Sequence, residues 1–529
     1  MTIRRPNRFL TATLSGALVV GALAGCSTAA ATPTDAASPV TLSDVATSVD
    51  DALADNEDYT ALAALADKSW DTASETTVAL DGDGATVSGD GATADGSTVT
   101  ISAPGTYRIS GTLDDGQVIV SSEADGLVRL VLDGADITSS TGSAIAVTQA
   151  DDVSVVLADG SSNSLTDAST YADTSEDAPN AALFSSDSMV ISGTGALNVT
   201  GRSNDGIASK DGLVIASGDI TVTAVDDGVR GKDFLVVAGG TIDVDATGDG
   251  LKADNEDGTN DDGETVGYAA LLGGEITVAS GDDGVHAESD LLVDGATVTV
   301  SESVEGLEAA HILVTSGTVD VISSDDGFNA AGTTSTADTA ETAETTTEGE
   351  PPASGTMPEG GPPQGGGGMP GEAAGDFSLV ITGGDVTVDA GGDGLDSNGT
   401  LTISGGDVTV FGPTNGGNGT LDSAGAITVD GGTLLAVGTS SMLQTPGDGS
   451  EGWVAATFDT LSAGTELTVV DSSGTAVAEV TLTKDTQSVV LASADVTSGE
   501  EYTIQADGSE IATATAGETP EGTEMAPRP

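Results

Sequence analysis

Seven short units of the form acid-Gly-apolar recur through the middle of the 529-residue chain and carry many of its candidate reactive side chains. The acids that precede the glycines are Asp205, Asp227, Asp249, Asp283, Glu305, Asp326 and Asp393. Because a repeat of about 22 residues stacks one unit on the next, we expect these acids to form a column. Stacked carboxylates repel one another by about 1 kcal/mol per pair in water, so the column favours bound cations.

The acidic column predicts a divalent metal site, and calcium is the ion that suits it. Calcium accepts several carboxylate and carbonyl oxygens in loose geometry. Additional acids directly before the column and an inserted acidic loop supply further oxygens, which gives the predicted ligands Asp205, Asp226, Asp227, Asp249, Asp254, Asp282, Asp283, Asp325 and Asp326. The alternative is that these aspartates only satisfy turns through side-chain to backbone hydrogen bonds.

Basic residues gather beside this acidic column in a chain that is otherwise poor in them. Arg230, Lys252 and His286 each stand two positions after a central glycine, and Lys210 and Lys232 stand four positions after one. On strands these positions alternate with core positions, so the side chains are expected to point outward. We predict that these five residues bind an acidic polysaccharide, with calcium bridging further carboxylates. The alternative is that they form intrachain salt bridges, and no catalytic residue is predicted.

Short β-strands must position these side chains. Between Asp227 and Asp249 the pattern gives a very short strand after Gly228, an apolar strand at 234–237 and an alternating strand at 241–245. Glycines at the corners allow the chain to turn. Three strands and three turns in about 22 residues predict one coil of a parallel β-helix, with coils stacked about 4.8 Å apart.

The N-terminus carries an export and lipidation signal. A basic n-region precedes the apolar stretch 9–24, which leads to the lipobox Leu23-Ala24-Gly25-Cys26. Cys26 is the only cysteine, so intramolecular disulfides are excluded. We expect a lipid at Cys26 to anchor the protein to the extracellular face of the cell membrane without spanning it. An ordinary secretory peptide is the alternative.

The charge balance excludes one class of partner. Removal of residues 1–25 takes away three of the 13 basic side chains and none of the 85 acids. A surface this acidic is unsuited to nucleic acid, because phosphate binding needs basic side chains. It suits divalent cations, a high-salt habitat or simple solubility. The sequence makes no prediction of oligomeric state.

Composition divides the chain into five parts. These are a signal peptide and lipobox (1–26), a polar stalk (27–76), the β-helix (77–443), a β cap (444–513) and a tail (514–529). A Thr/Glu-rich and Pro/Gly-rich stretch at 333–376 is predicted to be a disordered insertion within the β-helix.

Three of the repeats, Asn204–Asp211, Asp226–Asp233 and Gly248–Asn255, resemble the signature coils of a bacterial carbohydrate-binding domain-containing protein family. The resemblance implies an all-β fold, namely a right-handed parallel β-helix similar to that of pectate lyases, with bound calcium. It also implies binding of polygalacturonate or cellulose rather than cleavage. This chain departs from the family pattern at Glu305 and in the repeats from Gly394 onward.

The sequence therefore predicts a lipid-anchored, non-catalytic protein that binds polysaccharide in a calcium-dependent manner. Two alternatives remain open. The first is a calcium-dependent polysaccharide lyase in which one of the basic residues acts as the catalytic base. The second is a surface adhesin or spacer in which the repeats act as a rigid rod.

Overall fold

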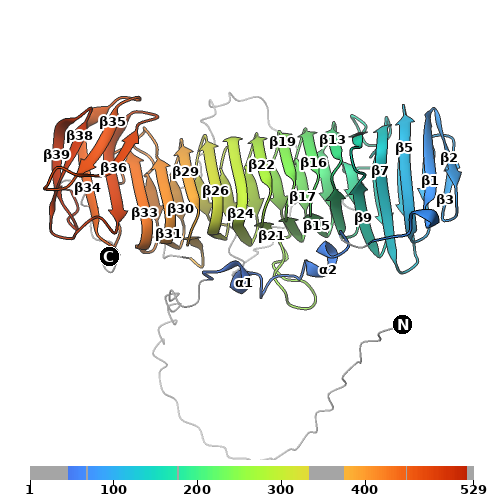
Figure 1. Cartoon of the computed structure of the whole chain (residues 1–529), viewed down its shortest axis with the longest axis horizontal. Helices are drawn as coiled ribbons and strands as arrows, with labels where there is room; N and C mark the ends of the chain where they lie inside the picture. The colour runs from blue at the N-terminus through green and yellow to red at the C-terminus, as the bar shows by residue number, and fades with distance from the viewer. Residues whose placement is uncertain (1–45, 67–68, 176–177, 333–374, 448–449, 521–529) are drawn as a thin grey trace, which may run out of the picture. The chain divides into compact units, whose positions relative to one another are not determined.

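The computed structural model describes residues 46–66, 69–175, 178–332, 375–447 and 450–520. They belong to one compact unit that extends from Val45 to Pro529. Nearly all of its regular structure is β-strand, and its helical elements are α1 (Val49–Ala52), α2 (Thr60–Ala63) and the 3-10 helix η2 (Thr72–Ser74) (Figure 1). None of the described helices has the length and apolar character to cross a membrane. Cys26 and most of the predicted insertion lie outside the described residues.

The largest sheet contains 22 of the described strands. Its members up to residue 246 are β1 (Thr76–Gly82), β2 (Gly84–Ser88), β5 (Gly105–Leu113), β7 (Leu127–Thr138), β9 (Asp152–Leu157), β10 (Ser162–Thr166), β12 (Met189–Gly193), β13 (Ala196–Gly201), β15 (Gly212–Ile215), β16 (Asp219–Ala224), β18 (Phe234–Val237) and β19 (Thr241–Ala246). The later members are β21 (Tyr268–Leu271), β22 (Glu275–Ser280), β24 (Asp290–Glu302), β26 (His311–Ser323), β28 (Ser378–Ile381), β29 (Asp385–Ala390), β31 (Thr400–Phe411), β33 (Ile427–Gly438), β34 (Trp453–Leu461) and β37 (Thr486–Ser493).

Two smaller sheets complete the described part of the chain. A 13-stranded sheet contains β3 (Ala92–Asp95), β4 (Thr98–Ile101), β6 (Gln117–Ser121), β8 (Ile145–Gln149), β11 (Ala181–Ser185), β14 (Asp205–Ser209), β17 (Val229–Gly231), β20 (Leu251–Ala253), β23 (Val285–Ala287), β25 (Leu307–Ala309), β27 (Phe328–Ala330), β30 (Leu395–Ser397) and β32 (Leu421–Ser423). A four-stranded antiparallel sheet contains β35 (Glu466–Val470), β36 (Ala476–Thr481), β38 (Glu501–Ala506) and β39 (Ser509–Thr515).

Parallel pairing between equivalent strands of successive repeats builds the two large sheets. In β16, β19 and β22, for example, Ile220, Ile242 and Ile276 stand in register and are buried. The residues between buried positions point to solvent because neighbouring side chains on a strand alternate sides. The inward ladders of Ile, Leu and Val form one continuous core, whose members extend from Val78 to Ala492.

The second strand of several repeats is apolar on both faces. All four residues of β15, β18 and β21 are buried. Their outer face forms a second apolar cluster, which includes Phe234 and Val236 together with Ala52 of α1 and Leu62 of α2. The helical segment therefore covers sheet surface that would otherwise expose a contiguous apolar patch. Both helices lie within residues 27–76, which the sequence predicts to be a stalk.

The central glycines allow successive repeats to approach closely. A Cβ added to Gly250 would clash with the Val278 side chain and with the carbonyl oxygen of Gly284. The corner glycines serve a different purpose, since Gly240 adopts a φ of 102°, which an L side chain rarely adopts.

The predicted fold class, a right-handed parallel β-helix solenoid with a small C-terminal β cap, is corrected by the strand pairing. Two of the three strands expected in each repeat belong to the same 22-stranded sheet rather than to separate faces. Later strands such as β24 and β26 continue through the predicted glycine corner. Their pairing is shifted at Asp294 instead of interrupted, because Gly295 and Gly317 adopt positive φ angles inside the strands.

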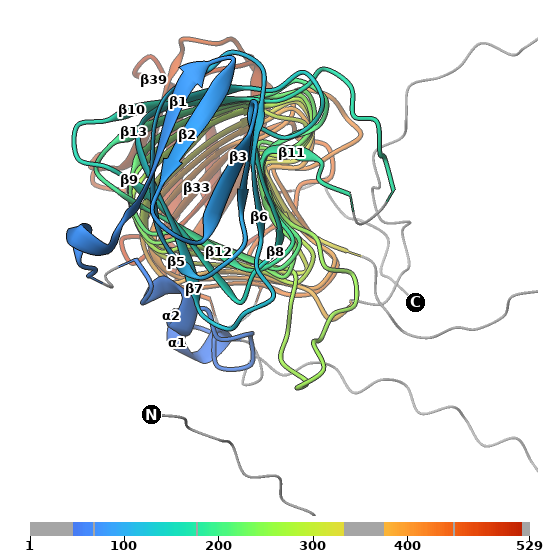
Figure 2. The ribbon, with the colours of Figure 1, turned by 90° about the vertical axis from the view of Figure 1, so that its right-hand side faces the viewer.

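Viewed along the stack, the strands close around the core as a barrel-like wall (Figure 2). Extra antiparallel strands are added at both ends, where β1 pairs with β2, and β37 pairs with β33 and β34. The fold is therefore an all-β, closed and mainly parallel strand wall with additional strands. The end of the chain also differs from the predicted cap, because β34 and β37 are part of the large sheet.

Candidate functional site

The candidate site lies along the 13-stranded sheet, where short strands such as β17 present one outward side chain between two buried residues. From β14 to β32 the residues at this position stand in register: Ala208, Arg230, Lys252, His286, Glu308, Asn329, Asp396 and Asp422. The acids before the central glycines are stacked alongside this column. The N–H of each central glycine donates to a backbone carbonyl in the next repeat, usually that of the acid at the equivalent position. The structure thus sets an acidic column beside one that changes from basic to acidic.

The backbone uses part of the acidic column. Asp227 Oδ1 accepts the amide N–H of Asp249 at 3.0 Å, and Asp249 Oδ1 accepts that of Asp283 at 2.9 Å. Asp326 accepts the amide N–H of Asp393 in the same way, at 2.6 Å. These are the side-chain to backbone bonds that the sequence left open as the alternative to metal binding. They occupy one oxygen of each carboxylate and leave the other for a base or a metal ion.

Asp205, at the start of the column, has amide partners on both oxygens. Asn180 Nδ2 donates to its Oδ2 and Asn204 Nδ2 to its Oδ1, each at 2.9 Å. Burial, and then the charge of Asp227, raise the pKa of Asp205 to about 8. Because amide donors already surround this carboxylate, the predicted ligand Asp205 is poorly suited to hold a cation.

Three of the five predicted carbohydrate-binding bases lie at one open pocket of about 640 Å³. Its lining consists of Ser186, Lys210, Arg230, Lys232, Asp254, Asn255, Glu256 and Asp257. Asp254 accepts hydrogen bonds from Nε and a terminal nitrogen of Arg230 at 2.8 and 2.9 Å, which holds the guanidinium in a fixed orientation. Lys232 forms no side-chain hydrogen bond or ion pair within the described residues. We call this the cationic pocket after its three bases, and its lining also contains three acids, Asp254, Glu256 and Asp257.

A smaller pocket of about 330 Å³ adjoins the cationic pocket through Lys210. Its lining includes Tyr171, whose hydroxyl donates to Asp167 at 2.8 Å. An aromatic ring beside a cationic pocket offers a sugar an apolar face next to a charged one. Nothing in the repeat pattern indicates Tyr171, because it lies on a loop between β10 and β11.

Lys252 does not line either pocket. Its ammonium nitrogen lies 2.7 Å from Asp249 Oδ2 and 3.2 Å from Asp227 Oδ2. Burial lowers the pKa of Lys252, but the two carboxylates raise it more, so the side chain stays charged. This base therefore neutralises two of the predicted metal ligands, which is the salt-bridge alternative left open by the sequence.

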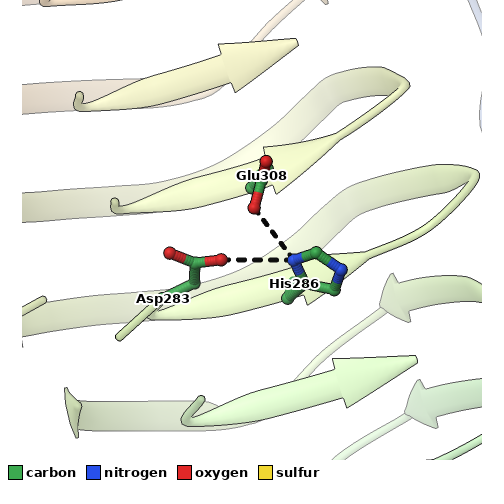
Figure 3. Close-up of side chains that lie close together, drawn as sticks. All are labelled: Asp283, His286 and Glu308. Atoms are coloured by element: carbon green, nitrogen blue, oxygen red, sulfur yellow. Dashed lines mark hydrogen bonds and ion pairs between the residues drawn. The ribbon is translucent and has the colours of Figure 1, made fainter. Parts of the chain in front are cut away.

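His286 is held in the same way (Figure 3). Its Nδ1 lies 3.2 Å from Asp283 Oδ2 and 3.0 Å from Glu308 Oε2, and its Nε2 lies 3.8 Å from Glu288. Burial lowers the pKa of His286, whereas the hydrogen bonds to Asp283, Glu288 and Glu308 raise it to about 12. A protonated imidazole at this position occupies the place of a cation, so His286 pairs with the acidic column through Asp283 and lies outside the cationic pocket.

Three groups of side chains in the described residues have ligand atoms close enough to hold a metal ion. They are Asp283 with His286 and Glu308, Asp249 with Asp282 and Asp283, and Asp393 with Asp396 and Asp422. The first two contain or adjoin the protonated His286 or Lys252. Of the other predicted ligands, Asp282 is the exposed member of the second group, Asp226 is exposed and Asp325 is half-buried.

In the third group, Asp393 and Asp396 form no ion pair with a base among the described residues, and Asp422 accepts a hydrogen bond from the side-chain amide of Gln444. Burial, and then Asp326, Asp393 and Asp422, raise the pKa of Asp396 to about 8. Burial likewise raises the pKa of Asp326 to about 8 and that of Asp393 to about 7. The neighbouring charges that contribute most to these shifts are all carboxylates, so the group favours a bound cation.

A neutral oxygen beside this acidic group supports the same conclusion. Asn329 stands in register with Asp396 and is only 9% exposed. Its Nδ2 donates to Glu305 at 2.7 Å, but its Oδ1 has no hydrogen-bond partner in the described part of the chain. A buried amide oxygen that accepts no hydrogen bond is unfavourable unless a bound ligand or ion interacts with it. Carboxylates with an amide oxygen are a donor set that calcium accepts.

Sequence analysis did not include Asp393, Asp396, Asp422 or Asn329 among the metal ligands. The signal was present in the repeated tripeptide Leu-Asp-Ser, which places Asp396 and Asp422 at the same position of adjacent strands. It did not lead to a prediction, because the repeats from Gly394 onward depart from the pattern of the family that the sequence resembles.

Comparisons with known proteins identify the family. A model of the carbohydrate-binding domain-containing protein family matches residues 95–349. A carbohydrate-binding domain-containing protein of Acetivibrio thermocellus is 36% identical over 217 residues, which are 41% of this chain and 74% of that protein. The chain therefore belongs to the carbohydrate-binding domain-containing protein family. Among solved structures, the gadolinium derivative of a polysaccharide lyase-like protein from C. thermocellum is 34% identical, with a TM-score of 0.41, and the match covers 43% of this chain and 91% of that one.

Proposed function

We propose that this protein binds an anionic polysaccharide at the cationic pocket, without cleaving it. The observation that carries the proposal is the convergence of Lys210, Arg230 and Lys232 on one open pocket in a chain of formal net charge −72, where they stand beside three acids, of which Asp254 is paired with Arg230. A uronate polymer such as polygalacturonate supplies one carboxylate per sugar, which a fixed guanidinium and a lysine ammonium can both contact. Membership of a carbohydrate-binding family supports the choice of a sugar polymer over other anions.

Calcium is part of the proposal, as a structural ion. The residues that would hold it are Asp393, Asp396 and Asp422 with the amide oxygen of Asn329. When bound, calcium would neutralise the carboxylates and join adjacent strands of the stack. Arg230 and Asp396 are separated by five strand spacings along the column, or about 24 Å, so an ion at this position is too distant to bridge a sugar in the cationic pocket.

The place of action is proposed from the N-terminal sequence alone. A lipid at Cys26 would retain the protein at the extracellular face of the cell membrane, where it can reach polysaccharide outside the cell.

The test is a calorimetric titration of the chain from Ser27 onward with polygalacturonate, with and without calcium, while the absorbance of unsaturated products is followed. Binding without product is expected, and binding to a neutral cellulose oligomer should be weaker. Formation of unsaturated product would instead identify a lyase. Absence of binding to both polymers would refute the proposal and favour a structural surface protein.

A further inference from the structure

The N-terminal strap, residues 46–66, lies against the outer face of the large sheet. Its two helices contact β24 and β12, and Ala52 and Leu62 are buried in the apolar cluster on that face. Between the helices, residues 55–57 contact a loop that begins more than 190 residues later in the sequence.

That loop, residues 254–267, connects β20 to β21 and is here called the pocket loop. Residues 254–257 form one wall of the cationic pocket. Asp254 holds Arg230, and Asn255 Nδ2 donates to Asp233 at 2.5 Å. The rest of the loop contains no strand, and its only regular pairing consists of isolated bridges at Thr265. Backbone hydrogen bonds from Asn255 N–H to Lys232 O and from Gly267 N–H to Asp233 O hold the two ends of the loop, whereas the sheet ladders do not fix the stretch between them.

The strap supports the part of the loop that lies beyond the pocket wall. Thr265 N–H donates to Asp55 O at 2.8 Å, and Glu57 N–H donates back to Thr265 O at 2.9 Å, as in a parallel strand pair. The Tyr268 hydroxyl donates to Glu57 O at 2.7 Å. Asn260 Nδ2 donates to the Glu57 carboxylate at 3.1 Å and to Glu264 at 3.0 Å. One strap residue, Glu57, thus contacts both the tip and the end of the pocket loop.

We propose that the N-terminal strap positions the wall of the cationic pocket, with Glu57 as the positioning residue, so that sugar affinity depends on strap docking. The inference rests on the proposed function of that pocket. Glu57 itself is absent from the pocket lining and acts through the loop that carries Asp254. Because coupling between two sites is reciprocal, a sugar that contacts the pocket loop must in turn stabilise the docked strap.

The test compares Glu57→Ala with Glu57→Gln in the full chain. Glu57→Ala removes the acceptor for Asn260, whereas Glu57→Gln keeps a side-chain oxygen there. Asp50→Ala is the matched control, since Asp50 is an exposed acid of the same strap whose side chain has no described contact with the pocket loop. Affinity for an oligogalacturonate is measured by calorimetry, and exchange of the amides of 46–66 and 254–267 by hydrogen–deuterium exchange. A thermal unfolding scan first checks that each variant is folded.

We expect Glu57→Ala to weaken sugar binding by about five- to twentyfold, a typical coupling between sites, and to speed amide exchange in the pocket loop. Glu57→Gln should restore most of the affinity, and Asp50→Ala should leave it unchanged. Sugar should also slow exchange in the strap of the unsubstituted protein. Faster exchange in the pocket loop with unchanged affinity would overturn the proposal, as would unchanged exchange in the loop. If the unsubstituted protein binds no sugar, the proposed function fails, whereas the exchange comparison still decides whether Glu57 holds the loop.

Discussion

The Lys252 ammonium lies 2.7 Å from Asp249, a carboxylate three residues earlier in the chain, and also reaches Asp227 in the neighbouring repeat. One base therefore takes the place that a metal ion was predicted to occupy between these repeats. The residues of the column thus divide by function: Arg230, with nearby Lys210 and Lys232, faces a pocket, whereas Lys252 and His286 compensate buried acids.

Replacement of Lys252 tests that division. Lys252→Ala leaves two buried carboxylates without their cation, and breaking a buried pair in this way is strongly destabilising. Because the lysine side chain is 23% exposed, we expect a loss of about 2 kcal/mol in the free energy of unfolding. Denaturant unfolding at pH 7 measures it. Lys252→Arg should lose less than half as much, and equal losses would contradict a role based on charge.

Replacement of Lys232 should lower sugar affinity and leave the free energy of unfolding nearly unchanged. Its ammonium group makes no ion pair within the described residues, so Lys232→Ala should change the free energy of unfolding by less than about 0.5 kcal/mol. Affinity for oligogalacturonate should fall about tenfold, and affinity of the unsubstituted protein should weaken as salt rises because exposed charges are screened. Lys252→Ala is the matched control, since it removes the same charge outside the pocket. Similar losses of affinity in both variants would indicate a general effect of net charge.

Calcium and pH should act together on stability. With calcium removed, Asp393 and Asp396 have pKa values of about 7 and 8, well above about 3.9 in the unfolded chain. Between these values the folded state binds more protons than the unfolded state. Its stability is therefore fully present below pH 4 and falls as pH rises toward 8, by up to about 1.4 kcal/mol per pH unit for each retained proton.

Calcium should remove most of this loss. At a concentration one hundred times its dissociation constant, one bound ion adds about 2.7 kcal/mol. Thermal unfolding from pH 5 to pH 8, with chelator or with calcium, measures both effects. The double variant Asp393→Asn/Asp396→Asn should lose the response to calcium, whereas Asp245→Asn, an exposed acid on β19, should retain it. A response retained by the double variant would place the ion elsewhere in the chain.

The stacking of the site could be predicted from sequence, but its contacts could not. The regular spacing of the acid-Gly-apolar units is sufficient to place Arg230, Lys252 and His286 on adjacent strands, because one repeat forms one layer. The pattern does not specify whether the side chain of a base lines an open pocket or forms an ion pair with a neighbouring acid. That depends on rotamers and on inserted loops, as with Asp254, which the sequence assigned to metal and the structure pairs with Arg230.

The strap and the sheet topology were harder to predict. Most of the apolar side chains in residues 46–66 are small alanines, and the clearer indication that something covers the sheet lies elsewhere, in apolar runs such as 234–237 that are buried on both faces. The prediction that glycines end the strands at each corner was also wrong for some repeats, because a glycine of positive φ can bend a continuous strand as well as end one. At Gly295 and Gly317 it does the former, which joins strands that the repeat pattern separates.

Close packing at the central glycines gives a last prediction. Gly250→Ala adds a Cβ that meets the Val278 side chain and the Gly284 carbonyl oxygen, and the carbonyl is fixed by the ladder. We expect a loss of about 3 kcal/mol in the free energy of unfolding, at the upper end of overpacking effects. Gly96→Ala is the control, since a Cβ there meets nothing within 4 Å and only the φ of 60° is unfavourable, at about 1 kcal/mol. If both variants lose the same amount by denaturant unfolding, close approach between repeats is not the reason for glycine in the column.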